Sequence, residues 1–522
     1  MKKWLLAVAL LLPIGGGILY FNRSKIRSQW EPLARQQLIS YLENRFDSSV
    51  EIGSLDFSLA PDGKTFQAFG EDFKLRYKRR TDIEPMILFR KISFSADLAM
   101  LYKGSRTIHE VRIEGLRITI PPRGQRPVAK RKEEQPEKLQ GEEIPPAADK
   151  NPVWIQKIIA DGSFLQILPS KEGKLPLEFD LFKLTLTSPA PGSALEYETV
   201  MTNPKPPGDI LAKGHFGPWN REDPRRSPLD GNYTFSNADL GVFKGIAGIL
   251  DSTGTFNGVV EDISAEGECR VADFRLTSSG NPVPLSVTFT ATIDGTNGDT
   301  FLKPVKAQLG STQFTASGHV VGLKGISGRS IHLEVNMPSG NLTDLLHLAV
   351  KGEDQFLKGR VRLTTTIDIP PGNVSVVEKI RLKGRFEIRQ GLFTSDKIQD
   401  QIDGLSRRGQ GQPKSPTITD VPGAFNGRFS MSEGKVRFEP VIFVVPGALV
   451  ELTGNYDVDP GLLDFHGSLN LEAKAGDTFS GWKRWALKPF NPILAKNDVG
   501  TYLKIAITGD KDNPHFGLDK KK

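Results

Sequence analysis

The chain has 522 residues, and its 68 lysine and arginine residues against 61 aspartate and glutamate residues give a net charge of +7. Because charges of both signs are mixed, this balance describes a solvated surface and excludes the basic footprint of a nucleic-acid-binding protein, while anionic lipid headgroups remain compatible partners. The single cysteine, Cys269, excludes an intrachain disulfide and a cysteine-based metal cage. Its alternating strand context favours a small buried residue over a reactive thiol.

The first apolar segment predicts a membrane anchor. Between Trp4 and Phe21 the only ionisable group is Tyr20, and at ~1.5 Å per residue the segment just crosses a hydrocarbon core. The apolar run continues to Phe21 without an Ala-x-Ala site, which favours an uncleaved anchor over a removed signal peptide. Basic residues flank both ends, so charge alone does not fix the orientation. The expected anchor residues are Trp4, Leu5, Leu6, Leu10, Leu11, Leu12, Ile18, Leu19, Tyr20 and Phe21.

Residues 28–46 predict an amphipathic helix. Apolar residues recur every four positions and share one face, and Pro32 is acceptable in the first turn. Such a helix either lies on the bilayer surface or packs on the first sheet, and the sequence does not separate the two arrangements. The apolar column consists of Trp30, Ala34, Leu38, Leu42 and Phe46.

After this helix the apolar pattern has a period of two. In SVTFTATID, VRLTTTIDI, KIRLKGRFEIR, LDFHGSLNLEA and LKIAITG, apolar residues alternate with polar or charged ones, as in antiparallel strands with one solvated face. A slip of this phase at Gly115 predicts a β-bulge. Between strands, the stretch from Pro121 to Asn151 is rich in Pro, Lys and Glu with almost no aromatic residues, which predicts a disordered linker.

Beyond residue 46, helices are predicted only near residues 241, 341, 396 and 482, too few to cover all the apolar strand faces. Those faces must pack sheet against sheet or line a groove that holds something apolar. We expect a mainly β fold, with an N-terminal transmembrane helix and an elongated, curved antiparallel-type β-sheet that forms an apolar groove with a few short capping helices. The expected groove-lining residues are Val361, Leu363, Ile367, Ile369, Ile380, Leu382, Phe386, Ile388, Leu463, Phe465, Leu469, Leu471, Leu503, Ile505 and Ile507.

Two regions of the chain resemble the AsmA family of bacterial envelope proteins, to which TamB and YhdP are related. The first is the amphipathic helix followed by NRFDSSVEIGSLDFSLAPDG, and the second spans IRLKGRFEIRQGLF to YLKIAITGDKDNPHFGLD. The resemblance implies a single-pass protein of the bacterial inner membrane with its body in the periplasm. It also implies a role in outer-membrane biogenesis, in which phospholipid is carried along a β groove with an apolar lining.

The resemblance and the composition together divide the chain into segments. These are a membrane anchor with its flanks (1–27), an AsmA-like N-terminal region (28–120), the disordered linker (121–151), a middle β region (152–356), an AsmA-like C-terminal region (357–518) and a basic tail (519–522). The sequence leaves the oligomeric state open.

Three classes of function compete at this point. The first is a lipid-conducting groove, which requires no catalytic residue, cofactor or metal. The second is a structural or regulatory envelope protein that acts through contacts with other envelope proteins. The third is a membrane-anchored hydrolase, with Asp457, Asp459, Asp464 and His466 as the nearest candidates. Strand alternation places most of these on a solvated face, and the chain lacks the GxSxG, P-loop and HExxH motifs, so we do not expect an enzyme.

Overall fold

The computed structural model describes residues 32–122, 154–473 and 501–519, with gaps at 33–34, 37, 41, 44–45, 47, 63, 98–106, 170–172, 221, 327, 353–354, 373 and 511–512. The predicted anchor from Trp4 to Phe21, all but the first two residues of the predicted linker, and the segment around Trp482 lie outside the described residues. Among the residues that are described, no helix combines the length and the hydropathy needed to cross a membrane.

The fold is mainly β, as predicted. Twenty-six strands belong to one largely antiparallel sheet, two short strands form a second sheet, and the described helices are few and short. The described residues form two compact units. The first unit comprises those of Met1–Ser236, Thr253–Ala265 and Ile293–Gly298, and the second comprises Asn237–Ser252, Glu266–Thr292 and those of Asp299–Lys522.

The first unit is a meander with one parallel step. Strands β5 and β6 pair in parallel with β7 and β8, and the other recorded pairings in this unit are antiparallel. Its strands are β1 (Ser48–Glu51), β2 (Ser54–Leu59), β3 (Thr65–Tyr77), β4 (Ile87–Asp97), β5 (Thr107–Glu114), β6 (Arg117–Ile120), β7 (Trp154–Ile159), β8 (Ser163–Ile167), β9 (Leu177–Thr187), β10 (Leu195–Pro204), β11 (Pro207–Phe216) and β12 (Pro228–Asp239), with a 3-10 turn η1 (Pro224–Arg226).

Two sequence predictions are tested in this unit. The described part of the amphipathic helix packs on the first strands, because Ile39, Leu42 and Phe46 contact the buried cluster that includes Val50 and Leu75. At Gly115 the predicted bulge is a full break between β5 and β6, and a φ of 68° there requires the glycine.

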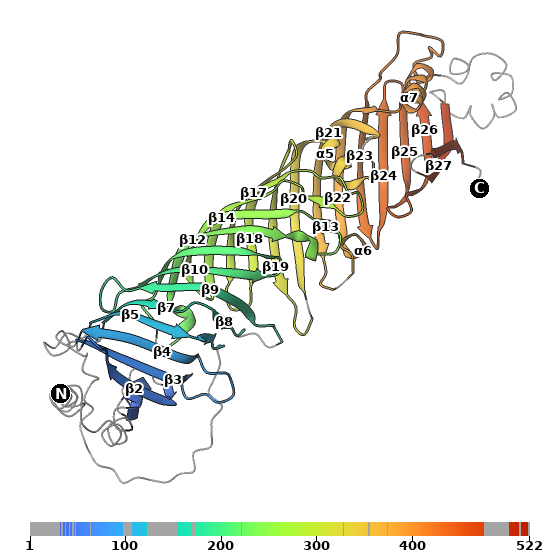
Figure 1. Cartoon of the computed structure of the whole chain (residues 1–522). Coiled ribbons are helices and arrows are strands. Elements are labelled where there is room, and N and C mark those ends of the chain that lie inside the picture. The colour runs from blue at the N-terminus through green and yellow to red at the C-terminus, as the bar shows by residue number, and fades with distance from the viewer. Residues whose placement is uncertain are drawn as a thin grey trace. The chain divides into compact units, whose positions relative to one another are not determined.

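The second unit is a regular meander. From β18 to β28 each strand pairs antiparallel with the next one in the chain, and Figure 1 shows them side by side in chain order. These strands are β18 (Asp299–Leu309), β19 (Thr312–Gly322), β20 (Arg329–Asn341), β21 (Leu357–Ile369), β22 (Arg381–Phe393), β23 (Gly423–Ser432), β24 (Lys435–Val445), β25 (Ala448–Asp457), β26 (Leu462–Leu471), β27 (Thr501–Asp510) and β28 (Asn513–Leu518). Strands β14 (Ile249–Val259), β15 (Asp262–Val271) and β17 (Leu285–Asp294), and the end of β12, contribute residues to both units.

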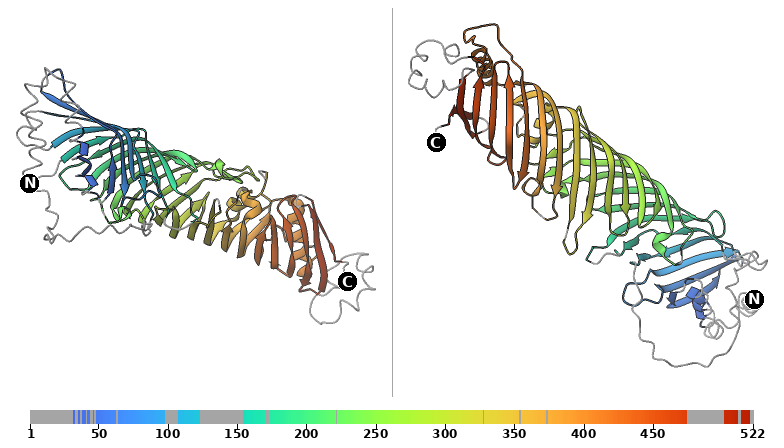
Figure 2. Two further views of the ribbon diagram at one scale, coloured as in Figure 1. Left: turned by 90° about the horizontal axis from the view of Figure 1, so that it is seen from below. Right: turned by 180° about the vertical axis from the view of Figure 1, so that it is seen from behind.

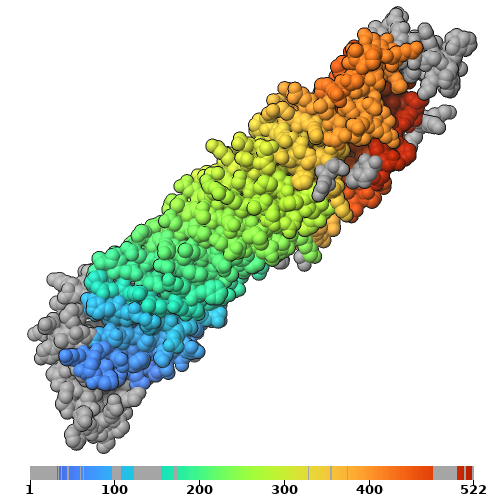
Figure 3. Space-filling view, turned by 45° about the horizontal axis from the view of Figure 1, so that its top comes forward, coloured from blue at the N-terminus to red at the C-terminus, as the bar shows by residue number. Residues whose placement is uncertain are grey.

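Three helices of the second unit connect strands. They are α5 (Leu342–Ala349), α6 (Val376–Lys379) and α7 (Asp396–Gly409), and α5 and α7 lie on the same side of the strand layer (Figure 2). The predictions of helices near 341 and 396 are confirmed. In the space-filling view the elements from β18 onward follow one another in colour from yellow-green to red (Figure 3).

The predicted helix near residue 241 is wrong. Residues 240–248 form a 3-10 turn η2 (Leu240–Val242) and a short strand β13 (Ile246–Ala247) that pairs with β16 (Arg275–Leu276). The sequence GVFKGIAGIL has helical spacing, but Gly245 and Gly248 adopt φ values of 99° and 137°, which no α-helix contains.

Segments 240–248 and 272–284 form an inner layer beside α5 and α6. Val376 N donates to Lys244 O at 3.0 Å, and Thr277 N donates to Gly245 O at 3.1 Å. At the other end of this layer, Asn281 Nδ2 lies 2.9 Å from the carbonyl oxygens of His347, Val350 and Gly352 around the end of α5. We call these two segments the crossbar.

Candidate functional site

The candidate site is the apolar face of strands β20–β27. Directly opposed residues of an antiparallel pair lie on the same face of the sheet. The strand register therefore shows which residues of neighbouring strands share that face. One row runs Leu333, Ile367, Leu382, Met431, Val436, Tyr456 and Leu463. A second row runs Gly340, Val361, Ile388, Phe425, Phe443, Val450, Leu469 and Leu503.

The register places the predicted lining residues together, with one exception. Fourteen of the fifteen lie on strands of this face, including Leu363 opposite Phe386 and Phe465 opposite Ile507. Ile380 does not lie on a strand, because it is the C-cap of α6 and precedes the first residue of β22. The alternation in KIRLKGRFEIR begins inside a helical turn, which the period of two does not reveal.

Aromatic rings and glycines alternate across the face. Ring centroids are 6.1 Å apart for Phe386 and Phe438 and 5.6 Å apart for Phe438 and Phe465. A Cβ at Gly427 would lie 3.2 Å from the Phe386 ring, and one at Gly454 would lie 2.8 Å from the Phe465 ring. Each ring thus occupies the space that the missing side chain leaves on the neighbouring strand.

Helices α5 and α7 cover one part of this face. Leu342, Leu345 and Leu346 of α5 pack in a cluster with Val361 and Ile388, which are 4% and 8% exposed. In a second cluster, Ile402 and Leu405 of α7 pack with Val450 and Leu471. These parts of the face are closed by the protein itself. The predicted lining residues Val361, Ile388 and Leu471 are therefore covered and cannot contact a ligand without helix movement.

Among the described residues, neither α5 nor α7 packs on the other part of the face, which we call the open row. Its members are half-buried and belong to none of the clusters that α5 and α7 cover. The register brings residues from five strands into this line. The open row consists of Ile367, Leu382, Met431, Val436 and Leu463.

An apolar cavity of about 240 Å³ lies on the same side of the sheet. A buried cluster around Val305, Ala316 and Val335 connects them, because Leu302 of the cavity wall and Ile367 of the open row both pack against it. The cavity wall and the open row therefore pack against one shared buried cluster and lie next to each other. The cavity is lined by Leu240, Leu250, Cys269, Val271, Leu285, Val287, Phe289, Leu302 and Val305.

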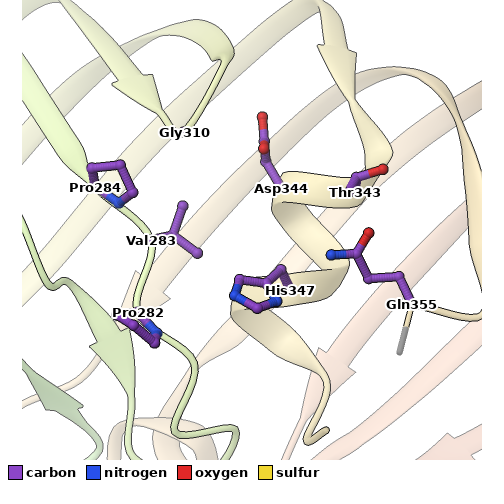
Figure 4. Close-up of a pocket in the computed structure, with 8 residues that line it drawn as sticks. All are labelled: Pro282, Val283, Pro284, Gly310, Thr343, Asp344, His347 and Gln355. Carbon is purple, nitrogen blue, oxygen red and sulfur yellow. The ribbon is translucent and has the colours of Figure 1, made fainter. Parts of the chain in front are cut away.

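A second, polar pocket of about 210 Å³ lies beside α5 (Figure 4). Asp344 and His347, one helical turn apart, face Val283 and Pro284 across it. The Asp344 carboxylate accepts hydrogen bonds from Ser311 N, Ser311 Oγ and Thr312 Oγ1 at 2.7–2.9 Å. The buried His347 Nδ1 has no partner in the structure. The carboxylate is committed to holding the β18–β19 turn, so it does not form an acid–base pair with His347.

The opposite face of the sheet is charged. Arg362 pairs with the half-buried Glu387 at 3.3 Å, and the exposed Arg437 pairs with the exposed Glu439 at 2.6 Å. Pairs of this kind contribute little stability, but they keep this face hydrated. The two faces therefore differ sharply in chemistry, as the alternation predicts.

Three of the predicted hydrolase candidates, Asp457, Asp464 and His466, lie on this charged face, and Asp459 lies in the turn between β25 and β26. His466 contacts Asp464 and Asp519, each at 3.0 Å, and Lys435 pairs with Asp457 at 3.2 Å. Neither the apolar cavity nor the polar pocket beside α5 is lined by any of them. Within residues 32–122, 154–473 and 501–519, no cluster of His, Cys, Asp and Glu could hold a metal ion.

Sequence reasoning missed the cavity and several members of the apolar face. Phe425, Phe429, Phe438 and Phe443 alternate in GAFNGRFSMS and KVRFEPVIFVV, a signal that could have identified them. Burial raises the pKa of the Cys269 thiol above its ordinary value, and Cys269 Sγ lies 3.4 Å from Ser252 Oγ. The sequence favours a small buried residue over a reactive thiol at this position, and the structure places Cys269 half-buried.

Comparison with known proteins gives no relative: no family model, curated protein or solved structure matches the chain.

Proposed function

We propose that the chain binds phospholipid and passes it along the apolar face of its second unit. The observation that carries the proposal is the open row, a line of half-buried apolar side chains contributed by five strands of one face. An acyl chain laid on it gains about 0.8 kcal/mol for each methylene group removed from water. Binding of this kind needs shape and an apolar lining, and no catalytic group.

The resemblance to the AsmA family supports the setting of this activity. In the proposed arrangement, Trp4 to Phe21 anchors the chain in the bacterial inner membrane and the β body lies in the periplasm. In this proposal the open row lines the curved groove expected from the sequence. The opposite face of the same strands is charged. Outer-membrane biogenesis is the process that such a lipid carrier would serve.

Native mass spectrometry of the purified full-length protein tests the proposal. We expect phospholipid to remain bound in the gas phase, and we expect its loss from a variant in which Leu382 and Met431 are both replaced by aspartate. A matched control replaces the neighbouring exposed residues Lys383 and Ser430, which face the opposite side. Equal lipid occupancy in all three proteins would contradict binding at the open row.

A structural or regulatory role is the second candidate, and one observation favours it. The clusters under α5 and α7 are closed cores of ordinary type, so part of the apolar face serves stability alone. If the open row were also covered by a protein partner, pull-down of the full-length protein would recover that partner in place of lipid.

A further inference from the structure

The apolar cavity of the second unit is large enough for part of a hydrocarbon chain. Its volume is about 240 Å³ and it is partly open to solvent; for scale, an enclosed apolar cavity of about 150 Å³ takes up benzene. The thiol of Cys269 is the only polar group among its lining side chains, and it lies beside Ser252. Its lining offers a bound water almost no hydrogen-bond partner. A charged or zwitterionic headgroup would find no partner either.

The crossbar supplies one wall of this cavity. Leu240 lines it from the 3-10 turn η2, which Asp239 caps by accepting a hydrogen bond from Gly241 N at 2.7 Å. Leu240 N also donates to Gly248 O at 3.0 Å, and the next part of the segment is tied to α6 through Lys244. The Leu240 side chain is thus held in place, and the cavity is a formed site.

We propose that this cavity holds the methyl end of one acyl chain of the phospholipid whose remaining length lies on the adjacent apolar face. Hydrocarbon is the occupant that matches an all-apolar wall, and the shared packing around Val305, Ala316 and Val335 joins the cavity to Ile367 of the open row. This inference rests on the proposed function, because it assigns one end of the same ligand. It makes the cavity the point at which a chain stops and the crossbar the structure that stops it.

Photo-crosslinking phospholipids test the assignment. Full-length protein is incubated with vesicles of phosphatidylethanolamine and phosphatidylglycerol that contain a diazirine either at the end of the acyl chain or beside its carboxyl group. We expect the terminal diazirine to label peptides around Leu250, Val287 and Leu302, and we expect the carboxyl-side diazirine to label other peptides. Labelling of the open row by both probes, with none in the cavity, would overturn the cavity assignment and leave the proposed function standing. If the probes label neither the open row nor the cavity, both the cavity assignment and the proposed function are wrong.

A cavity-filling variant provides an independent arm. Val287→Phe places a ring in the cavity, and Thr288→Phe places the same ring on the exposed face of the same strand. Because two methylene groups lost from burial weaken binding about tenfold, we expect a tenfold loss of terminal crosslinking for Val287→Phe and little change for Thr288→Phe. Equal crosslinking in the two variants would overturn the proposal.

Cys269 allows a test in the unmodified protein, in which no substitution can disturb folding. Since it is the only cysteine and lines the cavity, its alkylation by N-ethylmaleimide in the unmodified protein reports occupancy directly. We expect phospholipid vesicles to slow this alkylation severalfold, and an unchanged rate would count against an acyl chain in the cavity.

Discussion

A charge placed on the apolar face should have very different consequences at Val361 and at Leu382. Val361 is 4% exposed beneath α5, whereas Leu382 is half-buried in the open row. In Val361→Glu the carboxylate would be buried without a partner, which costs about 3–5 kcal/mol in addition to the lost burial of valine. In Leu382→Glu the carboxylate can reach water, so the cost is part of the roughly 1.5–3 kcal/mol that burying a leucine contributes.

The difference of about 3 kcal/mol between these estimates is large against a typical unfolding free energy of about 5–15 kcal/mol. Urea denaturation followed by far-UV circular dichroism measures it, with Lys383→Glu on the opposite, exposed face as the control, expected within about 0.5 kcal/mol of the parent. Leu382→Glu should at the same time lose phospholipid binding. If Leu382→Glu destabilises the protein as much as Val361→Glu, the open row is a closed core and our account of it is wrong.

Further predictions concern α5 and an exposed histidine. Asn281→Ala should cost about 1–3 kcal/mol, because it leaves carbonyl groups around the end of α5 without their donor. The amide hydrogens of α5 should exchange faster in Asn281→Ala than in the control variant Ser278→Ala. Equal exchange rates in the two variants would contradict the prediction. Asp230 raises the pKa of His215 above 6.5, first by a hydrogen bond at 2.9 Å and then by its charge. The stabilisation of the folded state by this pair should be complete below the ordinary pKa of histidine. It should disappear as the pH rises through the raised pKa of His215. An NMR titration of Asp230→Asn should show the pKa of His215 falling back, and an unchanged pKa would refute the pairing.

Strand alternation was sufficient to predict which side chains share a face. It could not predict what covers that face, because Val361 and Leu382 carry the same local pattern and differ only in whether α5 reaches them. Coverage is a tertiary property, set by segments distant in the sequence. The contact between Asn281 and His347, for example, spans 66 residues.

The cavity could not be predicted from the sequence for a second reason, which is the local backbone conformation of one wall segment. Its wall includes Leu240 and Leu250, which flank a segment with helical spacing. The positive φ angles at Gly245 and Gly248 turn that segment into the crossbar, and a glycine in a sequence does not reveal whether it adopts such an angle. Because a helix was predicted for this segment, the cavity could not be predicted from the sequence.

Site-specific photo-crosslinking in living cells tests the central claim most directly. A photoreactive amino acid is introduced singly at Leu382, Met431 or Val436 in the open row, or at Lys383, Ser430 or Arg437 on the charged face. Our account predicts that the first set captures phospholipid and the second does not. Equal capture from both faces, or none from the open row of a folded protein, would contradict it.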